Sequence, residues 1–390
     1  MMDYNFDQVT SRYGTDSTKW DSAVSRGKPA EVLPLWIADM DFPAPDCVIE
    51  ALSTRVGHGI FGYSDPSPGY FAALRKWFMG RFGYTFDPSW VVLTPGVVYA
   101  ICTAIHAYTN PGDAILIQEP VYHPFRQTVE RNERKLVVNE LELKDGSYSI
   151  DFADFEQQIV EHQAKLFLLC SPHNPIGRVW KADELREMVR ICVKHNCLIL
   201  ADEVHCDFVF PGHVHQMLPV LVPEAMDHII LTTAPSKTFN LAGFQVSNIF
   251  IANEDLRRTY QDVLKRQGYS NANGLGLVAC EAAYAGGADW LDALTVYLWE
   301  NMQFIDRFLR EHLPQVCLIQ PEGTYLAWLD ARELHLSTVE LDRKLIEEAG
   351  VWLSPGYSFG SAGAGFLRVN TGCPRSTLQD CLERMKGVFA

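Results

Sequence analysis

The sequence has little positive charge, and it lacks any long run of apolar residues. It contains 33 lysines and arginines against 48 aspartates and glutamates in 390 residues, which gives a formal net charge of −15. Nucleic-acid binding needs a basic surface that neutralises phosphates, so we expect no nucleic-acid partner. No apolar run approaches the roughly 20 residues that a helix needs to span a bilayer, so we expect no membrane partner. The first residues lack a basic region followed by an apolar core, so we predict no signal peptide and a cytoplasmic protein.

Cysteine pairs with metal-binding spacing are also missing. The ten cysteines include no Cys-x-x-Cys pair, and several lie in apolar runs, so we expect free, buried thiols rather than disulfides. His213 and His215 are metal-ligand residue types, but no matching pair completes a four-ligand set, and we predict no metal site. The glycines form no Gly-x-Gly-x-x-Gly fingerprint, so a nicotinamide-binding fold is not supported.

The sequence does contain a series of short apolar runs separated by helical patterns. Five runs rich in Ile, Leu and Val are predicted as buried strands: residues 114–118, 166–170, 198–201, 228–232 and 248–252. Between two of them, residues 181–196 place apolar side chains on one face of a predicted helix. Such strand–helix–strand units are typical of a mostly parallel sheet covered by helices on both faces. We therefore predict an α/β fold with a large domain of this kind.

The two ends of the chain have a different pattern. Residues 1–50 are polar and then rich in proline, and three- and four-residue spacing of apolar residues predicts a long helix from Trp290 onward. We expect residues 1–50 to form an N-terminal arm and part of a small α+β domain. Residues 51–289 would form the large domain, and residues 290–390 would complete the small one.

Polar residues follow three of the predicted strands. Asn174 lies in a turn after residues 166–170, Asp202 follows residues 198–201, and Lys237 comes shortly after residues 228–232. Each alone has an ordinary alternative: a turn, a helix cap or a solvated surface lysine. Ligands of open α/β sheets bind at the carboxyl ends of the strands, where these three residues would meet. A partly desolvated lysine has a lowered pKa, which suits Schiff-base chemistry.

This set of residues resembles the fold-type I pyridoxal-phosphate enzymes of the class I/II aminotransferase superfamily. The matching features are Asn174-Pro175, then Asp202, then Ser236-Lys237. Within that superfamily the sequence is most similar to the MalY/PatB-type cystathionine β-lyases, through four segments in the same order: residues 36–42, 202–205, 236–243 and 370–375. The resemblance covers nearly the whole chain, and it implies pyridoxal 5'-phosphate as the cofactor and the fold type I architecture.

The resemblance implies a role for each matching residue at the cofactor ring. Lys237 would bind the cofactor covalently and then act as the base on the substrate Cα proton. Asp202 would pair with the protonated ring nitrogen and keep the ring an effective electron sink. Asn174 would donate a hydrogen bond to the ring hydroxyl oxygen, and Tyr122 would stack over the ring. The predicted catalytic residues are therefore Lys237, Tyr122 and Asp202.

The cofactor phosphate would bind where a predicted strand at residues 91–93 gives way to a helix. Backbone N–H groups of Gly96, Val97 and Val98 would be free to bind it there, and Ser236 would add a hydroxyl. A helix N-terminus of this kind needs no positive side chain.

Two positions depart from the pattern of classical aminotransferases. Eight residues after Lys237, where those enzymes have a phosphate-binding arginine, this chain has Gln245. Three residues after Asp202, where they usually have a tyrosine, it has His205. His205 fits the pattern of the β-lyase subgroup, and we keep it among the predicted cofactor-binding residues.

The resemblance also implies how the substrate is bound. Arg368 would bind the substrate α-carboxylate through a bidentate fork, a task that lysine performs poorly. Asn174 and the backbone of Ala38 would help to hold the substrate. Tyr63 matches a tyrosine that reaches the phosphate of the neighbouring subunit, which would place it near cofactor and substrate there. We therefore predict a homodimer with a shared active site.

Three functions remain open at this point. The first is a carbon–sulfur β-lyase that cleaves cystathionine or a related cysteine S-conjugate to a thiol, pyruvate and ammonia. The second is an aminotransferase that passes the amino group to a 2-oxo acid. It remains open because it would use every residue named above. The third is a cofactor-bound regulatory protein. The intact set of Lys237, Asp202, Asn174 and Arg368 favours an enzyme, and the four matching segments favour the lyase.

Overall fold

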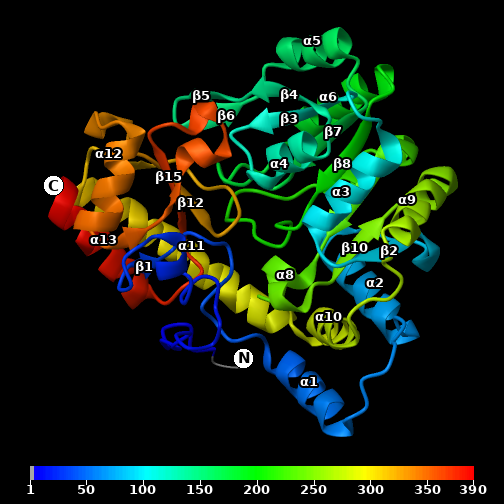
Figure 1. Cartoon of the computed structure of the whole chain (residues 1–390), viewed down its shortest axis with the longest axis horizontal. Helices are drawn as coiled ribbons and strands as arrows, with labels where there is room; N and C mark the ends of the chain where they lie inside the picture. The colour runs from blue at the N-terminus through cyan, green and yellow to red at the C-terminus, as the bar shows by residue number, and fades with distance from the viewer. Residues whose placement is uncertain (1–3) are drawn as a thin grey trace.

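The computed structural model describes residues 4–390 and is built around a seven-stranded sheet (Figure 1). The strand order is β2-β10-β9-β8-β7-β3-β4. The strands are β2 (Val91–Thr94), β3 (Ala114–Glu119), β4 (Lys135–Glu140), β7 (Leu166–Cys170), β8 (Leu198–Asp202), β9 (Ile229–Thr233) and β10 (Ser247–Phe250). In this sheet β10 is antiparallel to both of its neighbours, β2 and β9, and the other neighbouring strands are parallel to each other. The predicted α/β class with a mostly parallel sheet is confirmed.

Helices cover both faces of this sheet, and successive side chains of its strands therefore enter two different cores. Ile115 and Ile117 of β3 pack with the helices of one face, whereas Ala114 and Leu116 pack with those of the other. The first face carries α3 (Val97–Tyr108), α4 (Pro124–Arg131) and α9 (Glu254–Arg266). The second carries α2 (Pro68–Phe82), α5 (Phe152–His162), α6 (Ala182–Lys194) and α10 (Gly274–Gly286). Burial on both faces explains why the strands are apolar along their whole length.

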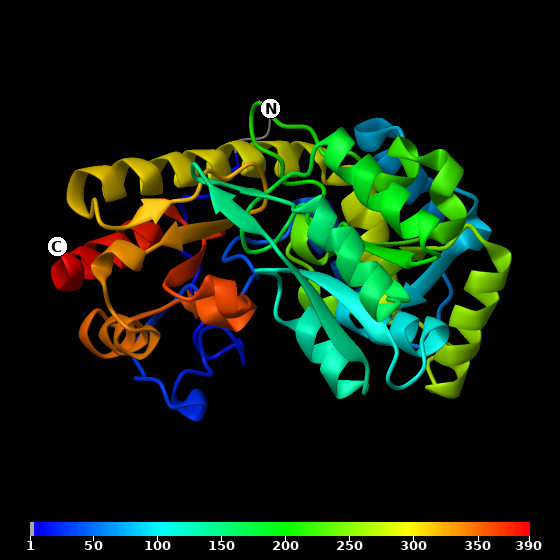
Figure 2. The same ribbon diagram turned by 90° about the horizontal axis from the view of Figure 1, so that it is seen from above.

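A second, antiparallel sheet is built from the C-terminal part of the chain. Its order is β11-β12-β15-β14, with β11 (Cys317–Leu318), β12 (Leu326–Asp330), β14 (Ser354–Pro355) and β15 (Phe366–Asn370). It is accompanied by α11 (Ala288–His312), α12 (Thr338–Arg343) and α13 (Arg375–Phe389). Figure 2 shows the orange and red elements of this part on one side of the molecule and the large sheet on the other, with the yellow helix α11 extending from the first side toward the middle. The long helix predicted from Trp290 is α11, which begins two residues earlier.

The N-terminal segment runs between these two parts. β1 (Leu33–Pro34) pairs in parallel with β13 (Val351–Trp352), whereas α1 (Asp46–His58) packs on α10. The chain between β1 and α1 therefore passes from the second sheet to the helices of the first. The backbone N–H of Asp41 donates to the carbonyl oxygen of Gly372, just after β15, at 2.8 Å. This path carries residues 36–42 across the carboxyl edge of the large sheet.

Other short elements are the hairpin of β5 (Glu142–Lys144) and β6 (Ser147–Ser149) and two four-residue helices, α7 (Leu218–Leu221) and α8 (Pro235–Thr238). Of these, α8 directly follows β9 at the carboxyl edge of the large sheet. All ten thiols are free; seven are buried, Cys47 and Cys102 are half-buried, and Cys317 is exposed. Among residues 4–390, no helix is both long enough and apolar enough to cross a membrane.

Candidate active site

A cavity of about 240 Å³ opens at the carboxyl edge of the large sheet. Its walls come from the ends of β7 and β8, from α8, from the start of α3 and from the N-terminal segment. The residues that line it include nearly all of the cofactor-binding residues predicted from the sequence: Gly96, Val97, Val98, Tyr122, Asn174, Asp202, His205, Ser236 and Lys237. Ala38 also lines it. Side chains that are far apart in the sequence thus meet around one space.

Lys237 lies on α8, four residues beyond the end of β9. Its Nζ donates a hydrogen bond to the carbonyl oxygen of Ala38 at 2.7 Å. The pKa of Lys237 is lowered to about 8, mainly by burial and also by the positive charge of Arg368, while the carboxylates of Asp39 and Asp202 act in the opposite direction. A lysine of this kind is a neutral, nucleophilic amine in a much larger fraction of molecules at pH 7–8 than a solvated lysine.

Asp202 is the last residue of β8, and its carboxyl group is buried. Oδ1 accepts a hydrogen bond from the backbone N–H of Val204 at 3.2 Å and one from the hydroxyl of Thr232 at 3.4 Å. Burial raises the pKa of Asp202 to about 7, although these hydrogen bonds and the charge of Lys237 lower it. A cation placed next to this carboxyl group in the cavity would strongly stabilise its ionised form.

Arg368 comes from β15 of the second sheet and reaches the loop after β7. Its Nη1 donates to Oδ1 of Asn174 at 3.1 Å, and its Nη2 donates to the carbonyl oxygen of Trp36 at 2.6 Å. The guanidinium carbon lies 4.9 Å from the centroid of the Phe359 ring. Burial lowers the pKa of Arg368 to about 10, and within residues 4–390 no carboxylate forms an ion pair with it. A buried, unpaired guanidinium is well suited to bind a carboxylate from a ligand.

The N-terminus of α3 supplies donors on another wall of the cavity. Gly96 is the N-cap residue, and its φ of 141° is a conformation that favours glycine. No side chain caps this helix end, and Val97, Val98 and Tyr99 line the cavity immediately after it. Backbone N–H groups at the start of a helix bind anions well. This wall is therefore suited to a phosphate group.

Two aromatic side chains complete the predicted set. The backbone N–H of Tyr122 donates to the carbonyl oxygen of Asn174 at 2.9 Å, which ties the two cavity walls together. His205 is buried against the ring of Tyr325, with the ring centroids 5.7 Å apart. Burial holds the pKa of His205 well below its usual range, so the imidazole is neutral at pH 7. Its Nδ1 is buried and has no hydrogen-bond partner within residues 4–390.

Tyr63 does not line this cavity. Its side chain is 94% exposed, in the stretch between α1 and α2. The sequence prediction placed Tyr63 in the active site of a second subunit, which this single chain does not test. His213 and His215, considered as metal ligands, have other surroundings: Nε2 of the buried His215 lies 2.7 Å from the carboxylate of Glu203.

Some residues at the site were missed by the sequence analysis. Tyr325 donates its hydroxyl to the carbonyl oxygen of Ala38 at 2.9 Å, next to the hydrogen bond from Lys237. Asn240 bonds to the backbone of residues 40 and 42 and thereby ties the Lys237 loop to the N-terminal segment. Asn240 lies in a segment that was matched to the family, so its position offered a signal. Tyr325 follows β11 in the second sheet, and no local pattern marked it.

The chain is similar over nearly its whole length to known proteins of one family. The family model described as aminotransferase class I and II matches residues 30–385. The chain is 40% identical to cystathionine beta-lyase PatB of Bacillus subtilis, over 99% of this chain and all of that protein. It is 37% identical to protein MalY of Escherichia coli, over 96% of each chain. The crystal structure of cystalysin from Treponema denticola, which contains a pyridoxal 5'-phosphate cofactor, has a TM-score of 0.96 at 36% identity, covering 99% of both chains.

Proposed function

The chain belongs to the class I and II aminotransferase family, and we propose that it is a pyridoxal-phosphate-dependent carbon–sulfur β-lyase acting on cystathionine or a related cysteine S-conjugate. The resemblance stated from the sequence is confirmed at the level of the family and of its MalY and PatB relatives. The observation that carries the proposal is that Lys237 and Asp202 line one cavity and Arg368 binds Asn174 of its wall, in a chain 40% identical to a cystathionine β-lyase over its length.

The residues of the cavity fit pyridoxal 5'-phosphate. The N-terminus of α3 would hold the phosphate, with the hydroxyl of Ser236 on the same cavity. Asp202, whose carboxyl group has a raised pKa and only neutral hydrogen-bond donors, would gain a protonated ring nitrogen as its partner. Lys237 would supply the amine that joins the cofactor, and Tyr122 an aromatic ring beside it. When bound, the cofactor supplies an electron sink for negative charge that develops at the Cα of an amino acid.

The protein side chains would orient the substrate and move its protons. Arg368 would take the α-carboxylate in a bidentate fork, with Asn174 holding one edge of the guanidinium in place. Lys237 would then remove the proton from Cα, because its lowered pKa makes Nζ an effective base near neutral pH. The carbonyl oxygen of Ala38 would accept a hydrogen bond from the protonated Nζ, as it does in this structure. With cystathionine, the overall reaction consumes one water and yields homocysteine, pyruvate and ammonia.

The reaction class is tested by product analysis. Incubation of the cofactor-loaded enzyme with cystathionine should release thiol and pyruvate in equal amounts without any added 2-oxo acid. A panel of cysteine S-conjugates with different leaving thiols would then rank the substrates. Turnover that requires a 2-oxo acid would instead identify an aminotransferase. A cofactor-loaded protein that turns over no sulfur amino acid and no amino-acid/oxo-acid pair would favour the regulatory role.

A homodimer with a shared active site is the second part of the proposal. Large apolar side chains are exposed along α1 and the stretch that follows it: Ile49, Val56, Ile60, Phe61 and Tyr63. In a single chain this is an unusual concentration of apolar surface, and a second copy of the chain would bury it. It lies in the same stretch as Tyr63, which would then enter the partner's cavity. The residues that bind the cofactor phosphate of each site would then come from both subunits.

Hybrid dimers test this arrangement. A Tyr63→Ala variant and a Lys237→Ala variant should each be nearly inactive, whereas a mixture that has exchanged subunits should regain activity. Random reassociation of equal amounts makes half of the dimers mixed, each with one intact site, so about a quarter of wild-type activity is expected. Gel filtration checks the dimer, and mixing before and after mild denaturation checks the exchange. Exchanged mixtures that stay inactive would contradict a shared site.

The division into domains follows the same proposal. Residues 51–289 would form the cofactor-binding domain, and residues 1–50 and 290–390 the smaller one that supplies Arg368. The parallel pairing of β1 with β13 supports the grouping of the two chain ends. The cytoplasmic location and the absence of a nucleic-acid partner stay predictions from the sequence.

A further inference from the structure

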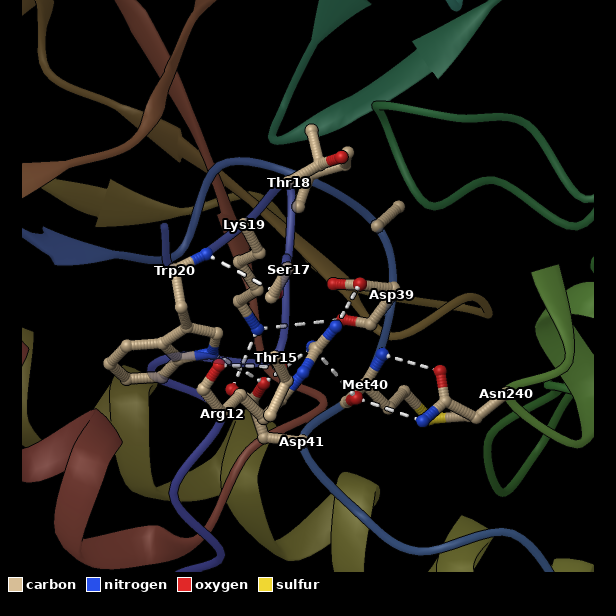
Figure 3. Close-up of polar contacts among 12 residues, drawn as sticks. Arg12, Thr15, Ser17, Thr18, Lys19, Trp20, Asp39, Met40, Asp41 and Asn240 are labelled. Atoms are coloured by element: carbon tan, nitrogen blue, oxygen red, sulfur yellow. Dashed lines mark hydrogen bonds and ion pairs between the residues drawn. The ribbon is translucent and has the colours of Figure 1, made fainter. Parts of the chain in front are cut away.

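Residues 36–42, which we call the cover segment, are held against the Lys237 loop by side chains that bind their backbone. Asn240 accepts from the backbone N–H of Met40 at 2.9 Å and donates to the carbonyl oxygen of the same residue at 2.8 Å (Figure 3). Asn370 donates to the carbonyl oxygens of Ile37 and Asp39, at 2.7 and 2.6 Å. The position of the cover segment is therefore fixed on both sides of Ala38, whose carbonyl oxygen contacts Lys237.

An ion cluster lies on the outer side of the cover segment. Nη2 of Arg12 lies 2.7 Å from Oδ2 of Asp39, and its Nη1 lies 2.9 Å from Oδ1 of Asp41 (Figure 3). Nζ of Lys19 lies 2.7 Å from Oδ2 of Asp41, and the indole N–H of Trp20 donates to Oδ1 of Asp41 at 2.9 Å. Lys19 is completely buried, and Asp41 nearly so. Arg12 thus bridges both carboxylates of the cover segment.

The two carboxylates of this cluster differ in how completely they are satisfied. Asp41 binds two cations and an indole N–H, so its charge is fully balanced where it stands. Asp39 has Arg12 on Oδ2, whereas its Oδ1 is buried and has no hydrogen-bond partner within residues 4–390. Asp39 also directly follows Ala38, which holds Nζ of Lys237. The cluster contains two cations and two carboxylates, and its carboxylate oxygen without a partner within residues 4–390 belongs to Asp39, beside the residue that binds Lys237.

Resting on the function proposed above, we propose that Asp39 and Arg12 are positioning residues of the active site, in which Asp39 provides a negative charge facing the Lys237 nitrogen and Arg12 limits that charge. The cover segment holds the Asp39 carboxylate near the cavity, and the ion cluster fixes the distance between this carboxylate and the Lys237 nitrogen. Neither side chain needs to touch the substrate. Their role would be to set the pH range in which the Lys237 nitrogen carries its proton.

The other charged groups around Lys237 define the background for this effect. Arg368 faces it from β15 and lowers its pKa, and Asp202 faces it from the end of β8 and raises it. His205 is neutral because of burial, and burial likewise raises the pKa of Tyr325, so its hydroxyl stays neutral. These four groups remain in place when Asp39 or Arg12 is replaced. Asp39 is the largest of the contributions that raise the pKa of Lys237.

Opposite signs distinguish this role from a structural one. Asp39→Asn removes a negative charge and should lower the pH at which the Lys237 nitrogen loses its proton. Arg12→Gln leaves the Asp39 carboxylate without its counter-charge and should raise that pH. A difference of about 0.5–1 pH unit in each direction is expected for a charge at this range in a partly buried site. The double variant should titrate close to the wild type, because both charges are gone.

The measurement is a spectrophotometric pH titration of the cofactor-loaded enzyme, since the absorption of the bound cofactor reports protonation of the nitrogen it shares with Lys237. Arg12→Lys should restore the wild-type midpoint, and Asp39→Glu should stay on the wild-type side of Asp39→Asn. Arg310→Gln is the matched control, because Arg310 forms an exposed ion pair with Asp306. Its midpoint should not move. If Arg12→Gln does not fold, Arg12→Met removes the same charge while keeping an unbranched side chain, and it should raise the midpoint in the same way.

Two results would overturn the inference. Midpoints that stay at the wild-type value in both single variants would show that the pair does not act on the Lys237 nitrogen. Shifts in the same direction would show that the cluster acts only by holding the cover segment in place. A wild-type protein that forms no absorption band with pyridoxal 5'-phosphate would be a different failure, because it would refute the proposed function itself.

Discussion

Lys237→Ala is expected to lose turnover by at least about 10³-fold and to lose the covalent link to pyridoxal 5'-phosphate. Nζ of Lys237 enters the cavity on a short helix after β9, and its pKa is lowered to about 8 by burial. No other lysine lines the cavity within residues 4–390, so none there is placed to replace it. The measurement is steady-state release of thiol and pyruvate, together with mass spectrometry after borohydride reduction, which should label the Lys237 peptide in the wild type only.

A control separates loss of the amine from loss of the fold. Lys265→Ala removes a lysine that forms an exposed ion pair with Asp262, and it should leave both activity and labelling unchanged. Unchanged circular dichroism of Lys237→Ala would show that the cavity still forms. A label that persists at another lysine, or an absorption band that survives the substitution, would show that Lys237 is not the residue that binds the cofactor.

The sequence predicted the carboxyl edge of the large sheet well, because that edge depends on local patterns. Asn174, Asp202 and Lys237 each follow an apolar strand, and parallel strands bring their carboxyl ends together. Once the strands were recognised, the meeting of the three residues followed from the topology. The edge strand β4 did not follow, because only Val137 and Asn139 of its six residues are buried and its apolar pattern is weaker. The antiparallel direction of β10 did not follow either, because an apolar run does not show in which direction a strand runs.

Residues contributed by the second sheet and the N-terminal segment could not be placed in this way. Arg368 was identified only through resemblance to a family, because nothing in residues 366–370 indicates which side chain faces a cavity in the other sheet. For Ala38 the sequence suggested that the backbone helps to hold the substrate, and it gave no sign that the carbonyl oxygen accepts a hydrogen bond from Lys237. Arg12 and Tyr325 carried no signal, since their contacts depend on how two sheets approach each other. Such long-range placement has no local counterpart in the sequence.

Asp202→Asn is expected to lower turnover by about 10²–10³-fold while leaving the fold intact. Asparagine has nearly the same shape and can still accept hydrogen bonds from the Val204 N–H and the Thr232 hydroxyl. It cannot carry the negative charge that would pair with a protonated ring nitrogen, so the cofactor would become a poorer electron sink. Affinity for pyridoxal 5'-phosphate, measured by equilibrium dialysis, should fall as well. Wild-type turnover in this variant would contradict the role proposed for Asp202.

The same substitution has an opposite effect on the cofactor-free protein, which makes the two roles of the carboxylate separable. The pKa of Asp202 is about 7 in the folded chain, above its ordinary value of 3.8, so folding favours the protonated acid. The wild type should therefore lose stability as the pH rises from about 4 to about 7, and Asp202→Asn should not. Thermal unfolding at pH 5 and pH 8 should show a smaller decrease in Tm for the variant than for the wild type.

Adding pyridoxal 5'-phosphate should stabilise the wild type more than the variant, because only the wild type gains a counter-charge for its buried carboxylate. Equal stabilisation of both proteins would mean that Asp202 does not contact the cofactor. The buried carboxylate is thus expected to weaken the empty protein and to strengthen the complex, and both effects have the same physical cause.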